Sequence, residues 1–142
     1  GHTYIGHPIA CAAANAVVEK LTSGGLVERS AKMGEVLHAA LTEVFGQHPH
    51  VGDIRGRGLF RGLEFVKDRA SKIPFDPTIG MAAKLKRNAM KNGLICYPNS
   101  GTIDGVRGDH VLLAPPFIIA DDQIGELVDK LAQSVEETLG ET

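Results

Sequence analysis

The chain has 142 residues, of which 43% are hydrophobic and 23% are charged, and its formal net charge is −2 at pH 7. This composition is typical of one folded domain and excludes a disordered or membrane-embedded chain. Basic and acidic residues are interleaved along the sequence, which argues against a nucleic-acid-binding surface. Cys11 and Cys96 are too few for a disulfide framework or a zinc site, so we expect a reducing, cytoplasmic environment.

The first half of the chain is predicted to form two helices and a pair of strands. An alanine-rich run over residues 9–21 follows Pro8, and proline suits the first turn of a helix. A Ser-Gly-Gly sequence at residues 23–25 ends this helix. Residues 26–45 then carry apolar side chains at helical spacing, up to stops at Gly46 and Pro49. Residues 51–55 and 59–66 are rich in strand formers and flank a glycine-rich bend, which predicts a hairpin.

The second half is predicted to alternate helix, two strands and helix. Asp76 and Pro77 form a capping and first-turn pair that starts a helix, which ends at residues 92–93, Asn-Gly. Residues 94–97 and 110–114 are expected to be strands, with a glycine-containing loop at 99–108 between them. The last helix runs from Asp121 to Gly140 with a regular apolar stripe. The order predicts an α+β fold in which helices cover one face of a small, mostly antiparallel sheet.

The polar residues by themselves do not form a complete catalytic set. Residues 56–62 resemble a dinucleotide-binding loop, but the third glycine is one position late and a strand follows where a helix is required. We interpret this segment as a tight bend with Arg55, Arg57 and Arg61 as solvated charges; the alternative is that Arg55 or Arg57 holds a carboxylate of a neighbouring domain. The histidines lack carboxylates or cysteines at metal-ligand spacing, and the helical lysines are expected to face solvent. We therefore predict no catalytic residue and no metal site.

Four motifs occur in a recognisable order. They are Gly-His-Thr-Tyr-Ile-Gly-His-Pro at residues 1–8, Arg-Gly-Arg-Gly-Leu-Phe-Arg-Gly-Leu-Glu at 55–64, Gly-Leu-Ile at 93–95 and Leu-Leu-Ala-Pro-Pro-Phe-Ile-Ile at 112–119. Together they resemble the carboxyl-terminal part of class-III (omega-type) pyridoxal-phosphate-dependent aminotransferases. The resemblance covers nearly the whole chain. It implies the carboxyl-terminal domain of a fold-type-I enzyme, with residues 1–22 as a linker and helix at the large-domain boundary and 23–142 as the small domain.

The resemblance also implies a function for a longer parent protein. That parent would move an amino group between an amino acid or amine and a keto acid through pyridoxal 5′-phosphate, as a homodimer in which this domain contacts its own large domain and a second subunit. The Schiff-base lysine is expected upstream of residue 1, so the chain alone is expected to be inactive. Two alternatives stay open: an aminomutase or decarboxylase relative, and a stand-alone α+β module that binds a protein partner. No nucleic-acid or membrane partner is expected.

Two residues receive roles from the resemblance. Thr3 is expected to bind the cofactor phosphate in the neighbouring subunit, since a small hydroxyl and backbone N–H groups beside glycines approach a phosphate closely; alternatively, Thr3 only packs or caps the start of the chain. Leu112 occupies the position where relatives acting on ornithine-like or 4-aminobutyrate-like substrates have arginine. Arg107 is therefore the candidate for the substrate carboxylate, and the alternative is that it pairs with Asp104 or Asp109.

The first two helices have a further expected property. In the parent, residues 8–21 and 26–45 are predicted to face the large domain and the second subunit. Alone, they would expose apolar surface, and we expect the chain to form dimers or larger oligomers.

Overall fold

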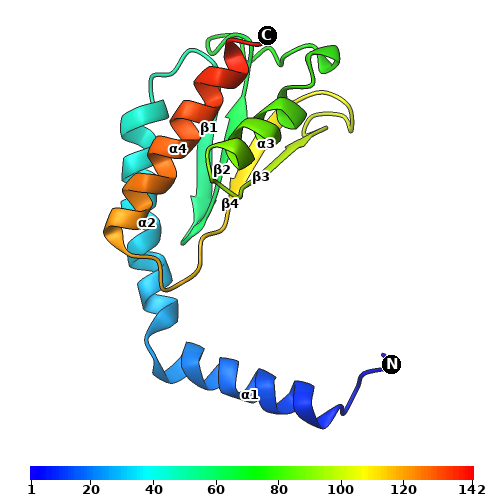
Figure 1. Ribbon diagram of the computed structural model, residues 1–142, viewed down its shortest axis with the longest axis vertical. Helices are drawn as coiled ribbons and strands as arrows, with labels where there is room; N and C mark the ends of the chain where they lie inside the picture. The colour runs from blue at the N-terminus through cyan, green and yellow to red at the C-terminus, as the bar shows by residue number, and fades with distance from the viewer.

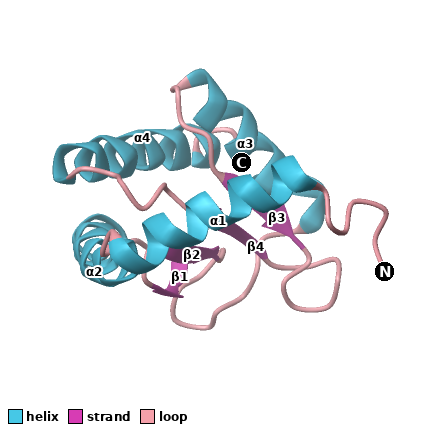
Figure 2. Cartoon of the chain, turned by 90° about the horizontal axis from the view of Figure 1, so that it is seen from below, coloured by secondary structure: helices cyan, strands magenta, loops and turns pink.

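Four helices and four strands make up the chain, and the computed structural model describes all residues from Gly1 to Thr142. The elements are α1 (Pro8–Ser23), α2 (Leu26–Phe45), β1 (Val51–Arg57), β2 (Phe60–Phe65), a 3₁₀ turn (Pro77–Ile79), α3 (Met81–Lys91), β3 (Tyr97–Ser100), β4 (Asp109–Leu113) and α4 (Asp121–Leu139). The strands form a single antiparallel sheet in the order β1-β2-β4-β3. In Figure 2, α3 and α4 lie on one side of the strands. The predicted α+β architecture is confirmed.

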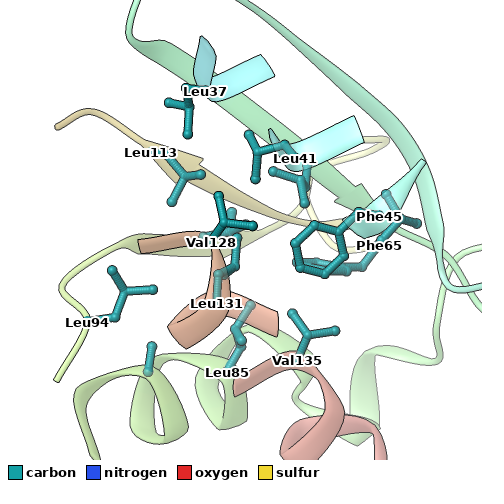
Figure 3. Packing of buried hydrophobic residues seen from close by; sticks show 14 of the residues in the cluster. Leu37, Leu41, Phe45, Phe65, Leu85, Leu94, Leu113, Val128, Leu131 and Val135 are labelled. Carbon is teal, nitrogen blue, oxygen red and sulfur yellow. The ribbon is translucent and has the colours of Figure 1, made fainter. Parts of the chain in front are cut away.

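The two faces of the sheet differ because side chains alternate along each strand. On the central strands, Leu63, Phe65, Val111 and Leu113 point to the helices and are buried, whereas Glu64 and Leu112, which lie between them, are only partly covered. The helices contribute the other half of the core, as the close view in Figure 3 shows. Twenty buried apolar residues form one continuous cluster. Burying them is the main favourable contribution to folding, because each large apolar side chain contributes about 1.5–3 kcal/mol.

Helix α2 joins the core through one face only. Met33, Leu37, Leu41 and Phe45 recur every four residues and are all buried. The helix contacts both β1 and α4. The expectation that residues 26–45 expose apolar surface was therefore wrong for this stripe, which the sheet and α4 of the same chain cover; it is confirmed only for Val27 and Val44, which remain exposed.

Helix α1 is different, because none of its residues is buried. Gly25 adopts a left-handed φ of 63° between the two helices, a conformation that glycine tolerates, and the chain changes direction there. Figure 1 shows α1 leaving the sheet-and-helix body at this junction, with the amino terminus at its far end. The exposed side chains of Ile9, Val17 and Val18 lie on it. For α1, the predicted exposure of apolar surface is confirmed.

The glycine-rich hairpin between β1 and β2 is held by a buried arginine. Only 5% of Arg61 is exposed. Its Nε donates to the carbonyl oxygen of Gly58 (2.9 Å) and its Nη1 to that of Gly56 (3.1 Å), while Nη2 donates to the carbonyl oxygen of Gly34 (2.8 Å) and to the carboxylate of Glu35 (2.9 Å). The interpretation of Arg61 as a solvated charge was wrong, because this side chain ties the hairpin turn to α2.

Two predicted boundaries also differ. Asp76 caps only a 3₁₀ turn, accepting from the N–H of Thr78 (2.8 Å), and Gly80 then adopts a left-handed φ of 67° that separates this turn from α3. The third strand begins at Tyr97, where pairing with β4 starts, rather than at residue 94. Leu94 is instead buried in the core. No helix is both long enough and apolar enough to cross a membrane.

Candidate functional site

The amino-terminal segment presents a hydroxyl in an exposed turn. Thr3 lies in a turn over residues 3–6 that ends at Gly6, where φ is 77°. His7 then caps α1, because its Nδ1 accepts a hydrogen bond from the N–H of Ala10 (3.3 Å), and Pro8 occupies the first helical position. The motif therefore forms a turn and then the start of α1. Thr3 lies at the surface, just before α1 begins.

The turn around Thr3 leaves some of its backbone N–H groups unpaired. Within this segment, the N–H of Ile5 donates to the carbonyl oxygen of His2 (3.0 Å), and the N–H of His7 donates to that of Tyr4 (3.1 Å). The N–H groups of Thr3, Tyr4 and Gly6 have no acceptor in the chain. Exposed N–H groups beside a hydroxyl can all donate to the oxygens of one dianion.

The second predicted residue lies in the loop between β3 and β4. Asp104 accepts from the backbone N–H groups of Val106 (3.0 Å) and Arg107 (2.7 Å), and its other oxygen accepts from Arg107 Nε (2.7 Å). The backbone N–H of Arg107, followed by its guanidinium, lowers the pKa of Asp104 to about 2. The pairing that the alternative expected for Arg107 is therefore present. The two terminal amino groups of the guanidinium make no hydrogen bond within the chain and remain available to a carboxylate.

Thr3 and Arg107 do not come together in one chain. Figure 1 shows the amino terminus at the lower end of the molecule, beyond α1, whereas the β3–β4 loop lies near the upper end. A single copy of the chain consequently has two separate candidate sites. Such a separation is compatible with a threonine that serves the site of a neighbouring subunit, the arrangement that the resemblance implies.

The open face of the sheet carries a polar cluster that the sequence did not identify. Arg55 Nη1 donates to Asp53 (2.8 Å) and to Glu64 on the adjacent strand (2.7 Å). These hydrogen bonds, that to Asp53 first, raise the pKa of Arg55. Charged residues alternate with other residues along β1, and strand pairing places Asp53 opposite Glu64 on β2. This alternation is the sequence feature that could have predicted the cluster. Arg55 is thus already paired within the domain.

An apolar groove continues from this cluster across the same face. Two adjoining cavities, of about 280 and 360 Å³, share the side chains of Phe60 and Leu112. Leu112 lies opposite Gly62 on one side and Tyr97 on the other, so the small glycine leaves room above the sheet. The position where the resemblance expects arginine in some relatives is therefore part of an apolar groove.

The remaining reactive side chains do not form a further catalytic cluster. No group of three or more His, Cys, Asp or Glu side chains is arranged to hold a metal ion. His48 contacts the exposed carboxylate of Glu136 (3.1 Å), which links the α2–β1 connection to α4. Cys11 and Cys96 are both free, and burial raises the pKa of the Cys96 thiol to about 11. A thiol with such a pKa is a poor nucleophile near neutral pH.

Comparison with known proteins places these features in a family context. Residues 1–135 match the model of the family described as Aminotransferase class-III. An uncharacterized aminotransferase of Schizosaccharomyces pombe, C1771.03c, is 52% identical over 96% of the chain, and the Bacillus subtilis uncharacterized aminotransferase YodT is 39% identical over 95%. The crystal structure of a thermostable (S)-enantioselective omega-transaminase from Thermomicrobium roseum superimposes on 98% of the chain with a TM-score of 0.85 and 33% identity. The chain spans about 30% of the length of these proteins.

Proposed function

Because this chain belongs to the class-III aminotransferase family, we propose that it is the carboxyl-terminal portion of a pyridoxal-phosphate-dependent aminotransferase. The parent enzyme would move an amino group between an amino acid or amine and a keto acid. The family match over residues 1–135 is the observation that carries this proposal. The fold supports it, because the same helices and strands occur in solved transaminases, and the predicted fold class, the carboxyl-terminal domain of a fold-type-I enzyme, is confirmed.

The shape of the chain supports a division into two parts. We place residues 1–22 at the boundary with a large domain and residues 23–142 in the small domain. Two observations support this division: no residue of α1 is buried, and the continuous core begins at Met33 in α2. Helix α1 would then be covered by the large domain and by the second subunit of a homodimer. The two free thiols, Cys11 and Cys96, support a cytoplasmic location.

Thr3 would hold the cofactor phosphate. Its hydroxyl and the unpaired N–H groups of residues 3, 4 and 6 supply donors of the kind that a phosphate dianion requires. When bound, pyridoxal phosphate supplies an electron sink that lets the amino group leave one carbon and join another. The Schiff-base lysine would come from the part of the parent outside these residues, so the chain alone would not catalyse transfer.

Arg107 would receive the substrate carboxylate through its two terminal amino groups. Asp104 holds Nε, which fixes one edge of the guanidinium and leaves the opposite end for a bidentate contact. The loop carrying Arg107 also has glycines with positive φ at residues 101, 105 and 108, so its path depends on glycine at these turns. Movement of this loop toward or away from the sheet would change how far the guanidinium reaches.

A chimeric enzyme tests the proposal. The carboxyl-terminal part of the S. pombe relative, from the position matching Gly1, is replaced by this chain, and keto-acid formation from an amino donor is measured with added pyridoxal phosphate. We expect amino transfer by the chimera and none by the chain alone. A chimera that folds as a dimer and binds the cofactor but transfers no amino group, beside an active parent, would contradict the proposal.

Two variants of the same chimera test the site residues. Thr3→Ala removes one charge-assisted hydrogen bond and should weaken cofactor binding about 10- to 100-fold. Thr22→Ala is the matched control, because the Thr22 hydroxyl donates only to carbonyl oxygens of its own helix. Arg107→Ala should raise KM for a keto acid far more than for an aldehyde, and Arg87→Ala, at an exposed arginine that pairs with Glu141, should leave both unchanged. Equal effects on keto acid and aldehyde would remove the assignment of Arg107.

A further inference from the structure

A cavity of about 260 Å³ lies between the second half of α2 and the edge strand β1, outside the residues to which the family resemblance assigns a role. Polar side chains line one part of it, namely His38, Thr42, Asp53 and Arg69. Phe45 and Ile54 supply an apolar wall. The cavity is therefore amphipathic, as expected of a site for a small molecule with one polar end.

Arg69 brings a positive charge to this cavity without a carboxylate partner. It is half-buried and makes no ion pair. Its Nη1 donates only weakly, to the carbonyl oxygens of His48 (3.3 Å) and Val51 (3.4 Å). Nε and Nη2 donate to no atom of the chain. These two nitrogens lie on the same edge of the guanidinium and match the spacing of the two oxygens of a carboxylate.

His38 adds an imidazole ring to the lining of the cavity. Its Nδ1 is buried and has no hydrogen-bond partner in the chain. An imidazole ring carries a proton on at least one nitrogen, so this side chain can donate an N–H to a ligand.

The carboxylate that lines the cavity is paired with another arginine. Asp53 accepts a hydrogen bond from Arg55 Nη1 at 2.8 Å, and because the same nitrogen also donates to Glu64 (2.7 Å), Arg55 offsets only part of the charge of Asp53. Arg69, by contrast, has no ion pair, and it lies in the cavity together with an imidazole ring and an apolar wall. The unpaired guanidinium favours an anion at its own end of the cavity.

We propose that this cavity is a second binding site, which takes a small carboxylate with a compact apolar body. The carboxylate lies against Arg69 and receives the N–H of His38, and the apolar body packs on Phe45 and Ile54. The site does not depend on the proposed amino transfer, because it includes neither Thr3 nor Arg107.

The probe for this site is sodium isobutyrate, titrated into the ¹⁵N-labelled chain at constant ionic strength with chloride as the balancing anion. We expect saturable NMR shifts confined to the His38 ring and to the amides of Gly46 and Gly52, which line the cavity. Arg69→Gln should weaken binding at least about tenfold, because a charge-assisted bidentate contact is lost. Arg57→Gln, at an exposed arginine without an ion pair, should not change it.

Thr42→Leu provides a second test that leaves the hydrogen bonds of Arg69 in place. Leucine fills part of the cavity from an exposed helical position and should abolish the shifts even if Arg69→Gln fails to fold. Shifts that do not saturate, or that survive both variants, would overturn the proposal. The same titration is repeated with inorganic phosphate. Saturable shifts at the same groups with phosphate but not with isobutyrate would also overturn the proposal, because the apolar wall would then have no role in binding.

Discussion

Replacing Arg61 with methionine tests the structural role of the buried arginine in the β1–β2 hairpin. Methionine has a similar length and no hydrogen-bond donor. The substitution removes the bonds to the carbonyl oxygens of Gly34, Gly56 and Gly58 and the ion pair with Glu35. Three of the four lost partners are backbone carbonyl groups and the fourth is a carboxylate, so a second variant that changes only the carboxylate separates the two contributions.

The carbonyl groups should account for most of the cost. Of the four bonds, the one to Gly34 joins two buried groups, and a buried acceptor left without a donor costs about 1–3 kcal/mol. The hairpin carbonyls are nearer to solvent and cost less. The ion pair contributes little, because 77% of the Glu35 side chain is exposed and exposed pairs are worth less than about 1 kcal/mol. We expect Arg61→Met to lower the free energy of unfolding by about 2–4 kcal/mol.

Urea denaturation followed by far-ultraviolet circular dichroism measures this difference. With an m-value of about 2 kcal/mol/M, the midpoint should fall by about 1–2 M. Glu35→Gln is the control and should shift the midpoint by less than half of that. An Arg61→Met midpoint equal to that of the wild type, or a Glu35→Gln variant that is equally destabilised, would refute the reasoning.

Three further predictions concern other parts of the chain. Gly34→Ala should destabilise by about 1–3 kcal/mol in the same urea assay, although alanine normally favours helices, because the new Cβ would lie 2.2 Å from the backbone of Gly58; an equal or higher midpoint would contradict this contact. Asp104 has its pKa lowered to about 2 in the folded chain, so its hydrogen bonds favour folding above about pH 4 and are lost as the pH falls toward 2. A carboxyl ¹³C NMR titration of Asp104 with a midpoint near 4 would disprove this shift. Cys11 should react rapidly with a thiol reagent at pH 8 and Cys96 slowly, because Cys96 is partly buried and its pKa is raised to about 11; two equally fast thiols would show that Cys96 is accessible.

Local sequence patterns predicted some helix and strand boundaries correctly and others wrongly. The apolar spacing of residues 26–45 predicted α2 correctly, because the 3.6-residue period depends only on neighbours along the chain. The helix expected to start at Asp76 begins at Met81 instead, because Gly80 adopts a left-handed conformation. Leu94 was expected in a strand, yet it packs in the core, and strand pairing begins only where β4 lies alongside.

Only the site residues that belong to a recognisable family motif could be predicted from the sequence. Thr3 and Arg107 came from the family resemblance, and the ion pair of Arg107 with Asp104 was among the alternatives because the two residues are close in the sequence. The pairing of Arg55 with Glu64 required the register of β1 against β2. Charged residues alternate along β1, but this pattern predicts the ion pair only when the register of the strands is known.

The sequence by itself determined the family, the order of helices and strands, and which side chains are apolar at helical or strand spacing. These properties depend on residues a few positions apart, or on motifs that occur in order along the chain. The tertiary structure decided that Arg61 is buried, that α2 is covered while α1 is not, and that His38 and Arg69 line one cavity. Those outcomes depend on contacts between distant segments, such as the bond from Arg61 to Gly34, 27 residues away, because burial and hydrogen bonding are set by which elements pack together.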